Sequence, residues 1–457
     1  MTTLWTAAEI AAATGGTAAG DFAVGGVAFD SREVGPGDLF VAMTGEATDG
    51  HRFIDKAFAA GAAGAVVSEP VDHPHVRVAD TTAALDALGR AARARTAARI
   101  IGVTGSVGKT GTKEALFAAL DRPEPGCAHR SVKSYNNHTG VPLSLARMPA
   151  DSRFGIFEMG MNHAGELAAL TRLVRPHVAL VTAIAPAHVA HFRDESAIAD
   201  AKGEIFQGLE PGGVAIIPYD SPHRDRLAAA AAPYASRIWT FGRDKGADVR
   251  AREEVRSLRG TLVTAVLPGA ELTFTVAQPG AHWVSNALAV IAAVHAAEGD
   301  LAAAGLALAE MPGLKGRGER SRVPVAGGDV LLIDESYNAN PLSMNATIRL
   351  LGEEPAARRI VVLGEMRELG EGSPAFHAAL VDPIMAANVD HALLVGESMA
   401  ALATALEGRV DFEHVADAAT ALDRLRSMLA AGDAVLVKGS NAIGLGRIVD
   451  ALRAGID

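Results

Sequence analysis

The hydrophobic pattern along the chain changes period, and these changes predict where strands and helices lie. Between residues 99 and 314, short apolar runs typical of buried parallel strands alternate with longer segments of helical spacing. The expected strands cover residues 99–103, 154–158, 178–183, 214–218 and 237–241. Residues 248–276 alternate apolar and polar positions instead. This part therefore predicts a doubly wound, mostly parallel sheet flanked by antiparallel strands.

The parts on either side have strand and helix patterns of their own. Residues 1–82 combine short strand-like runs with a helix near 51–60, which predicts a small α/β domain. An alanine-rich helical segment, 81–98, follows, and we expect its Arg90, Arg93 and Arg95 to form a solvated face.

A stretch rich in glycine and charge, 311–325, predicts a second boundary. Beyond it, strands at 330–334, 360–363, 392–395 and 434–437 alternate with helices, as in a compact Rossmann-like domain. We therefore expect an α/β protein with three domains: 1–82, 83–314 and 315–457.

One stretch carries the strongest chemical signal. The sequence Thr104-Gly-Ser-Val-Gly-Lys-Thr110 lies between an expected strand and a helix expected at 113–120. Gly105 and Gly108 let successive N–H groups point inward, and the helix directs its positive end to the same place. Such a nest binds polyphosphate, with Lys109 on the β/γ oxygens and Thr110 holding Mg²⁺. The loop residues expected to contact the nucleotide are Thr104, Gly105, Ser106, Val107, Gly108, Lys109 and Thr110. The alternative is a glycine turn before an ordinary helix.

Composition narrows the class of protein. The chain has 457 residues, and its 42 Lys and Arg against 53 Asp and Glu give a net charge of −11, which argues against nucleic-acid binding. Cys127 is the only cysteine, so no intrachain disulfide can form and a reducing compartment fits. No apolar run reaches spanning length. We expect a cytoplasmic protein without membrane insertion.

Three residues follow strands, where a doubly wound sheet places its ligands. Glu158 ends an apolar strand and either binds magnesium through oxygen or complements the dipole of the next helix. His188 is either a metal ligand or a loop histidine, and the pattern leaves both open. Lys202 lies in a helix-compatible run, and pattern alone leaves it solvated.

Several polar stretches suit substrate contacts or, alternatively, form ordinary turns. Residues 134–142 include Asn136 and Asn137, and residues 334–341 place clustered acids and amides between a strand and a proline-started helix. Their strand-end positions predict a cleft shared with the phosphate loop. In the first domain, Asp30-Ser-Arg32 and Asp49-Gly-His51 could hold a nucleotide or phosphate.

These residues resemble a known family. The phosphate loop, Glu158, Ala185-Pro-Ala-His188, Ala201-Lys-Gly-Glu-Ile205 and Asn286 in its Gly280–Ala287 setting are similar to the ATP-dependent Mur ligases of peptidoglycan synthesis. The resemblance covers essentially the whole chain. Tyr337-Asn-Ala-Asn-Pro341, with Leu363-Gly-Glu-Met and Leu436-Val-Lys-Gly-Ser-Asn441, resembles the branch that adds D-alanyl-D-alanine.

The resemblance implies residue roles. A catalytic group, Lys109, Glu158, His188 and Lys202, would act on ATP with two magnesium ions. The metal ligands would be Thr110, Glu158, His188 and a carbamylated Lys202. Asn286, Arg317 and Asp334 would contact ATP, with Arg320 and Glu335 as alternatives to the last two. The substrate contacts would be Ser31, Arg32, Asp49, Asn136, Asn137, Tyr337, Asn338 and Asn340.

The implied activity joins D-alanyl-D-alanine to UDP-N-acetylmuramoyl-tripeptide through an acyl phosphate. We expect a monomer whose C-terminal domain closes about the 311–325 hinge region. Alternatives are a sister ligase adding one amino acid, a ligase like folylpolyglutamate synthase, or a protein of another class that uses the loop as a nucleotide switch.

Overall fold

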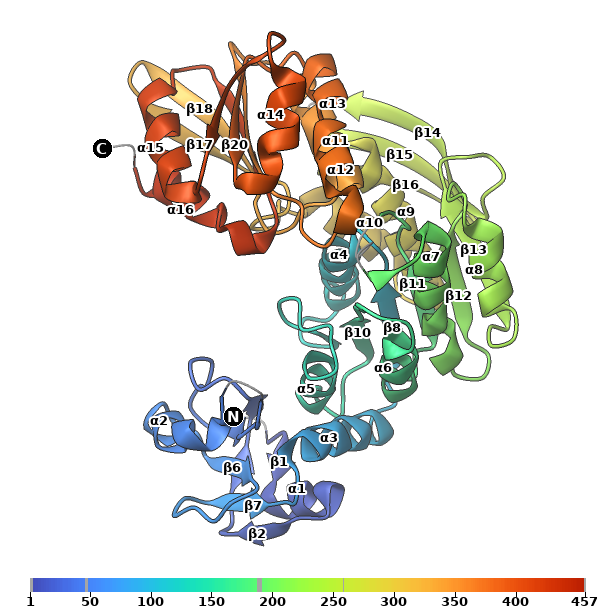
Figure 1. Cartoon of the computed structure of the whole chain (residues 1–457). Coiled ribbons are helices and arrows are strands. Elements are labelled where there is room, and N and C mark those ends of the chain that lie inside the picture. Colours follow the sequence, from blue (N-terminus) through green and yellow to red (C-terminus); the bar gives the residue numbers. More distant parts are fainter. Residues whose placement is uncertain (1–2, 46–47, 187–190, 258, 456–457) are drawn as a thin grey trace.

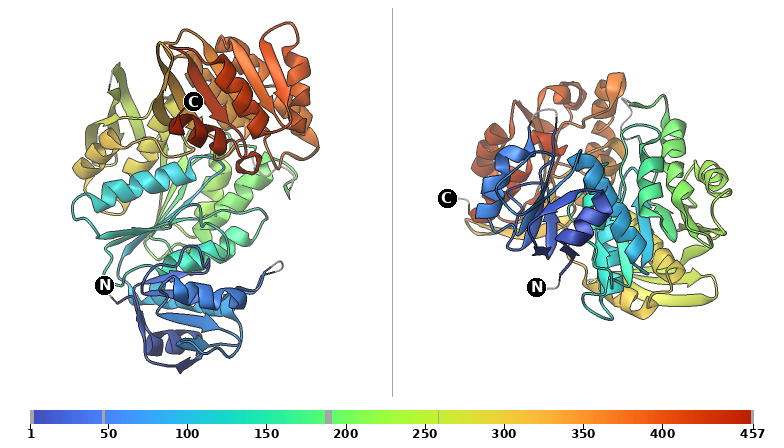
Figure 2. Two further views of the ribbon diagram at one scale, coloured as in Figure 1. Left: turned by 90° about the vertical axis from the view of Figure 1, so that its left-hand side faces the viewer. Right: turned by 90° about the horizontal axis from the view of Figure 1, so that it is seen from below.

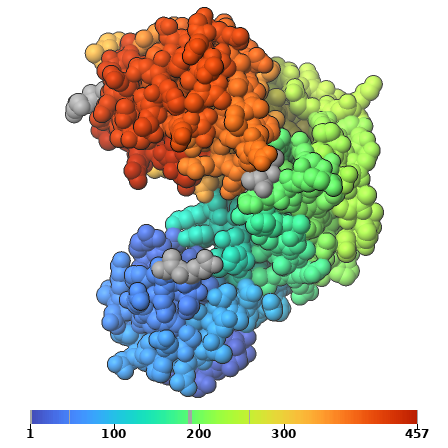
Figure 3. Space-filling model, viewed as in Figure 1, coloured from blue at the N-terminus to red at the C-terminus, as the bar shows by residue number. Residues whose placement is uncertain are grey.

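The computed structural model describes residues 3–45, 48–186, 191–257 and 259–455. Three α/β units follow one another along the chain, blue, cyan to yellow, and orange to red (Figures 1 and 2). The first and last units both join the central one, and the surface is deeply hollowed between them (Figure 3). Among the described residues, no helix has the length and apolar character needed to cross a membrane.

The N-terminal unit contains a five-stranded sheet in the order β2-β7-β6-β5-β4. Its strands are β2 (Thr17–Ala19), β4 (Gly26–Ala28), β5 (Asp38–Val41), β6 (Gly64–Val67) and β7 (His75–Arg77), with helices α1 (Ala7–Thr14) and α2 (Ile54–Ala59). A separate pair, β1 (Trp5–Thr6) and β3 (Ala23–Val24), is antiparallel. The predicted α/β pattern is confirmed, whereas α1 and β2 gave no clear sequence signal.

Helix α3 (Thr81–Arg95) joins this unit to the central one and packs against α5 (Gly140–Ala146). The prediction of a solvated arginine face is wrong for part of it. Arg93 is buried, and its guanidinium donates to the carbonyls of Val174 (2.8 Å) and Arg175 (2.7 Å) at the end of another helix. The last carbonyls of a helix have no N–H partner within the helix. The Arg93 guanidinium provides hydrogen-bond donors for two of them and so ties α3 to the central unit.

The central unit is built on a nine-stranded sheet in the order β16-β15-β14-β13-β12-β11-β8-β10-β9. The parallel strands are β8 (Arg99–Thr104), β9 (Ala128–Arg130), β10 (Phe154–Glu158), β11 (Val178–Val181), β12 (Val214–Pro218), β13 (Arg237–Gly242) and β14 (Val249–Ser257). Antiparallel strands β15 (Gly260–Leu267) and β16 (Ala270–Val276) extend the sheet beyond β14, as predicted.

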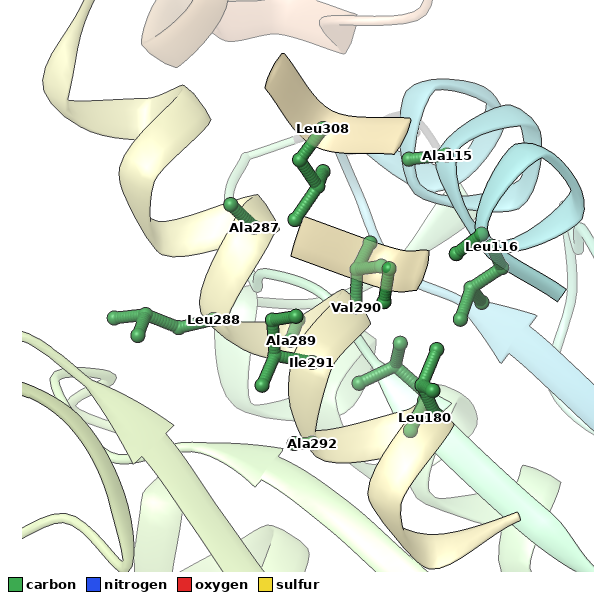
Figure 4. Close-up of a cluster of buried hydrophobic side chains, with 14 of the residues drawn as sticks. Ala115, Leu116, Leu180, Ala287, Leu288, Ala289, Val290, Ile291, Ala292 and Leu308 are labelled. Atoms are coloured by element: carbon green, nitrogen blue, oxygen red, sulfur yellow. The ribbon is translucent and has the colours of Figure 1, made fainter. Parts of the chain in front are cut away.

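Helices cover both faces of this sheet: α4 (Lys109–Asp121), α6 (Glu166–Val174), α7 (Glu195–Gly203), α8 (Arg224–Ala231), α9 (Ala281–Ala296) and α10 (Leu301–Glu310). Helix α9 is apolar around most of its surface because it is enclosed on several sides, and Val290 and Ile291 are fully buried. Figure 4 shows these side chains gathered with Leu116 of α4 and Leu180 of β11. This core holds the phosphate-loop helix firmly against the sheet.

The C-terminal unit has a six-stranded sheet in the order β17-β18-β22-β19-β20-β21. Its strands are β17 (Glu319–Val325), β18 (Gly328–Glu335), β19 (Arg359–Gly364), β20 (His391–Val395), β21 (Asp411–Val415) and β22 (Ala434–Lys438). Its helices are α11 (Pro341–Gly352), α12 (Ser373–Ala378), α13 (Val381–Ala386), α14 (Ala400–Leu406), α15 (Ala418–Met428) and α16 (Gly446–Ala454). Strand β17 pairs antiparallel with β18, so half of the stretch 311–325 belongs to the sheet itself.

Candidate active site

A cavity of about 550 Å³ lies between the central and C-terminal units. The phosphate loop and the end of β10 line one side, and the segment after β18 with the start of α11 lines the other. Of the residues singled out in the sequence, those that line it are Ser106, Val107, Gly108, Lys109, Thr110, Asn136, Glu158, Asn286, Arg317, Glu335, Tyr337, Asn338 and Asn340. The predicted cleft shared by phosphate loop and C-terminal unit is therefore present in the fold.

The loop between β8 and α4 depends on its two glycines. Gly105 (φ 150°) and Gly108 (φ 84°) both lie in the region that L-residues avoid. A Cβ atom on Gly105 would come within 2.0 Å of the Thr182 hydroxyl, so the loop also packs too closely for a side chain. Helix α4 begins at Lys109, four residues before the predicted start, and Gly108 caps it without a side-chain bond. The helix N-terminus therefore faces the cavity with backbone groups, as an anion site requires.

Lys109 is partly buried at this loop, and its ammonium donates to the carbonyl of Gly105 at 2.8 Å. Burial lowers the pKa of Lys109, while the charge of Glu158 opposes that shift and Arg317 adds to it. The pKa of Lys109 therefore depends on charged residues from both walls of the cavity, Glu158 of the central unit and Arg317 of the C-terminal unit.

Glu158 ends β10, and each of its carboxylate oxygens has a partner. Oε2 accepts from the Thr110 hydroxyl at 2.8 Å, and Oε1 accepts from the amide of Asn136 at 2.8 Å. The backbone N–H of Glu158 donates to the Ser131 hydroxyl at 3.1 Å. A buried carboxylate beside a threonine hydroxyl next to a phosphate nest is a donor set that fits Mg²⁺ sharing phosphate oxygens.

Of the other two expected metal ligands, the structure describes only Lys202. His188 lies outside the described residues. Lys202, on α7, is 1% exposed, and burial together with the nearby charge of Lys109 holds its pKa well below the usual range. The expectation from pattern alone that Lys202 is solvated is wrong. Within the described part of the chain, no group of three His, Cys, Asp or Glu side chains converges as a metal site.

On the opposite side, Arg317 is the arginine that faces the cavity. Its guanidinium lies 4.3 Å from the centroid of the Tyr337 ring and within 3.5 Å of the Ser134 hydroxyl of the central unit. Arg320 instead forms an ion pair with Glu354 and lines only a small neighbouring pocket. The geometry separates the two arginines that the sequence left as alternatives.

The two acids at the end of β18 are also separated. Asp334 is 1% exposed and accepts from the N–H of Gly316 (2.8 Å) and from the hydroxyl of Ser336 (2.6 Å), so it holds the connection between units. Glu335 lines the cavity and pairs with Lys438 at 3.3 Å. Lys438 also donates to the carbonyl of Asn338 at 2.9 Å, and burial lowers its pKa.

Several predicted substrate residues do not line the cavity. Asn137 accepts from the N–H groups of Thr139 (3.3 Å) and Gly140 (2.9 Å) and so shapes its own loop. In the N-terminal unit, Arg32 pairs with Asp30 at 2.6 Å, and Asp49 bonds to the ring of His51 at 2.7 Å. Ser31 lies in the same turn as Arg32. The predicted nucleotide and metal residues Thr104, Gly105, Asp334 and Lys202 do not line the cavity either.

The sequence gave no individual role to some residues that do line it, namely Ser134, Thr182, His282, Trp283 and Lys438. Lys438 belongs to the Leu436–Asn441 motif. Its position directly after the strand predicted at 434–437 could have indicated a place at the cavity. His282 and Trp283 lie in the first turn of α9 and carried no comparable signal.

Comparisons with known proteins agree with this arrangement. Family models match the chain in three consecutive parts: "Mur ligase family, catalytic domain" over residues 23–99, "Mur ligase middle domain" over 103–294, and "Mur ligase, glutamate ligase domain" over 316–441.

Curated relatives extend over nearly the whole chain. The UDP-N-acetylmuramoyl-tripeptide–D-alanyl-D-alanine ligase of Escherichia coli (strain K12) is 35% identical, covering 95% of this chain and 94% of its own. The ligase of the same name from Bacillus subtilis (strain 168) is 34% identical, covering 93% and 92%. A crystal structure of MurF from Acinetobacter baumannii superposes with a TM-score of 0.84 at 31% identity, covering 98% and 99%. The chain belongs to the Mur ligase family.

Proposed function

We propose that this chain is an ATP-dependent ligase that joins D-alanyl-D-alanine to UDP-N-acetylmuramoyl-tripeptide, forming an amide bond and yielding the pentapeptide precursor of peptidoglycan. The observation that carries the proposal is the near end-to-end similarity to ligases of that name. The cavity supports it, because a phosphate nest faces a polar wall contributed by a second unit.

The chemistry follows from the two walls. The tripeptide carboxylate attacks the γ-phosphate of ATP, forming an acyl phosphate and releasing ADP. The amine of D-alanyl-D-alanine then attacks the activated carbonyl, and phosphate leaves. Lys109 and the N-terminus of α4 stabilise charge on the transferring phosphoryl group, and Arg317 adds charge from the other unit. Asn286 lies beside Gly108 and suits the nucleoside end of ATP.

Magnesium fits the pair of Thr110 and Glu158, with His188 proposed as a further ligand. When bound, it would neutralise the phosphate oxygens. Lys202 suits carbamylation, because a buried amine with a lowered pKa is available in the neutral form that reacts with carbon dioxide. The carbamate would supply an anionic oxygen for a second ion.

The carbamate is tested with Lys202→Ala. This variant should lose most ligase activity and regain part of it when short carboxylic acids are added, since these replace the missing carboxylate. Full activity of the variant without added acid would remove the carbamate from the proposal.

The remaining substrate contacts are proposals of the same kind. Ser31, Arg32 and Asp49 suit the UDP end of the substrate, and Tyr337, Asn338 and Asn340 suit the incoming dipeptide. A cytoplasmic, monomeric enzyme that closes its C-terminal unit over ATP stays our prediction, as do the domain limits 1–82, 83–314 and 315–457.

The decisive experiment measures phosphate release from ATP with UDP-N-acetylmuramoyl-tripeptide and either D-alanyl-D-alanine or single amino acids. We expect release and a pentapeptide product with the dipeptide only. Release with a single amino acid and none with the dipeptide would favour a sister ligase. ATP hydrolysis that needs neither peptide would favour a nucleotide switch.

A further inference from the structure

Lys113 is a fully buried lysine that the proposed chemistry does not use. It lies on α4 one turn beyond Lys109 and three residues beyond Thr110, so all three side chains emerge near one face of the helix. Its ammonium forms an ion pair with Glu114 at 2.9 Å. Its second partner is a backbone carbonyl in another segment, that of Lys133, at 2.7 Å. An ammonium is rarely buried to this extent without a structural or chemical reason.

The partner segment, residues 131–136, is here named the junction loop because it contacts all three units. Lys133 forms an ion pair with Glu33 of the N-terminal unit, and the Tyr135 hydroxyl donates to Glu33 at 2.7 Å. Ser134 lies within 3.5 Å of the Arg317 guanidinium of the C-terminal unit. Asn136 donates to Glu158 in the central unit.

The backbone of this loop is held in a conformation that needs support. Lys133 has φ 52°, in the left-handed region that costs a non-glycine residue about 1–2 kcal/mol. The bond from Lys113 holds the carbonyl of this same residue, and the Glu33 contact holds its side chain. The loop therefore keeps its path because α4 and the N-terminal unit both fix Lys133.

These contacts close a ring around Glu158. Lys113 holds the junction loop; the loop places Asn136 on one carboxylate oxygen of Glu158; Thr110, on the same helix as Lys113, bonds to the other. Ser131, at the start of the loop, accepts from the N–H of Glu158. Both carboxylate oxygens are thus oriented by groups that depend on α4.

We propose that Lys113 is a positioning residue that fixes the junction loop to the phosphate-loop helix and thereby orients the Glu158 carboxylate for a divalent cation held with the nucleotide. The inference rests on the proposed ATP site and is independent of the peptide substrates. Groups that orient a metal ligand typically change metal affinity about 10–100-fold when removed.

The test measures ADP binding by isothermal titration calorimetry, once with Mg²⁺ and once with EDTA. The dissociation constant in EDTA divided by the dissociation constant in Mg²⁺ reports how much the cation strengthens ADP binding. We expect Lys113→Met to reduce this ratio about 10-fold while the affinity in EDTA stays nearly unchanged. Lys245→Met, the same change at an exposed lysine of the central unit, serves as control and should match the parent chain.

A double-mutant cycle distinguishes positioning from general destabilisation. Asn136→Ala should reduce the ratio by a similar factor, and the double variant should lose no more than the worse single variant, because both changes interrupt one path. Lys113→Arg, which keeps charge and donors, should recover most of the ratio. If Lys113→Met does not fold by circular dichroism, Lys113→Gln replaces it.

Two outcomes would overturn the inference: an unchanged Mg²⁺ ratio in folded Lys113 variants, or additive losses in the double variant. Failure of the parent chain to bind ADP would instead refute the proposed function. The two failures are therefore distinguishable in one set of titrations.

Discussion

Helices α4 and α11 both begin at the same cavity, but their N-termini are built differently. Helix α4 is preceded by Gly108, and no side chain caps it. Helix α11 is closed by a capping box, in which the oxygen of Asn340 accepts from the N–H of Ser343 at 2.9 Å and the Ser343 hydroxyl accepts from Asn340 N–H at 3.1 Å. Pro341 in its first turn removes one further donor.

This difference indicates which kind of ligand each side of the cavity suits. An uncapped helix end presents backbone donors and a positive dipole, which suit an anion. A capped end has used its donors internally and offers side chains instead, which suit a neutral or zwitterionic polar group. This difference supports our proposal that phosphate transfer occurs at α4 and dipeptide recognition at the segment before α11.

The largest expected effect comes from the uncapped side. Lys109→Ala should lower kcat by about 10³-fold, because removal of one charge-stabilising donor at a transition state typically costs about 10²–10³. Steady-state phosphate release measures it, with Lys245→Ala as control. A kcat within tenfold of the parent would show that α4 is not the phosphate side.

Gly108→Ala tests the backbone rather than a side chain. With φ 84° and an added Cβ 3.0 Å from Asn286, alanine should raise the KM for ATP about 10-fold and destabilise the fold by about 1–2 kcal/mol. Gly126→Ala is the matched control, since Gly126 has φ 91° and open space around it. The control should share the stability loss, measured by urea unfolding, and keep the parent KM. A normal KM in both variants would contradict the anion-nest assignment.

On the capped side, Asn340→Ala should cost about 1 kcal/mol of stability through loss of the cap. Asp417→Ala removes a comparable cap from α15, where Asp417 accepts from Thr420 N–H at 2.8 Å, and should cost the same without affecting activity. Asn340→Asp keeps the capping oxygen and loses the amide N–H groups. If Asn340 contacts the dipeptide, only the dipeptide KM rises in this variant; an unchanged KM would leave Asn340 a cap alone.

The smallest expected effect is a change in pH dependence. Burial lowers the pKa of Lys438, so between the folded and unfolded pKa values the unfolded state binds more protons, and stability rises with pH. Lys438→Met lacks this group. Its free energy of unfolding, measured in urea at pH 8 and 9.5, should therefore rise less with pH than that of the parent chain. An equal rise in both would show that Lys438 titrates alike in the folded and unfolded states.

Much of the fold was available from local pattern. Five parallel strands of the central unit, the antiparallel extension at 248–276 and four strands after residue 330 match the structure, because burial imposes a period that the sequence displays. The sequence did not predict β9, which has three half-buried residues, or the edge strand β21. Strand β17 was missed, since residues 319–325 are rich in charge and lie at a sheet edge where one side faces solvent.

Within the site, sequence identified groups but not their orientation. Arg317 and Arg320 are three residues apart in similar surroundings, and only the path of β17 directs one to the cavity and the other to Glu354. Asp334 and Glu335 point to opposite sides because side chains alternate along a strand, and the register of β18 decided which one is buried.

By itself, the sequence determined the phosphate loop, since Gly105, Gly108, Lys109 and Thr110 act through backbone freedom and chemistry that are local to seven residues. Only the tertiary structure decided which of the isolated lysines and arginines are buried. Arg93, Lys113, Lys202 and Lys438 carry side chains that solvate easily in any local context, and their burial depends on partners brought from distant segments. A charge becomes structural or reactive only when packing removes its water, and that depends on the whole fold.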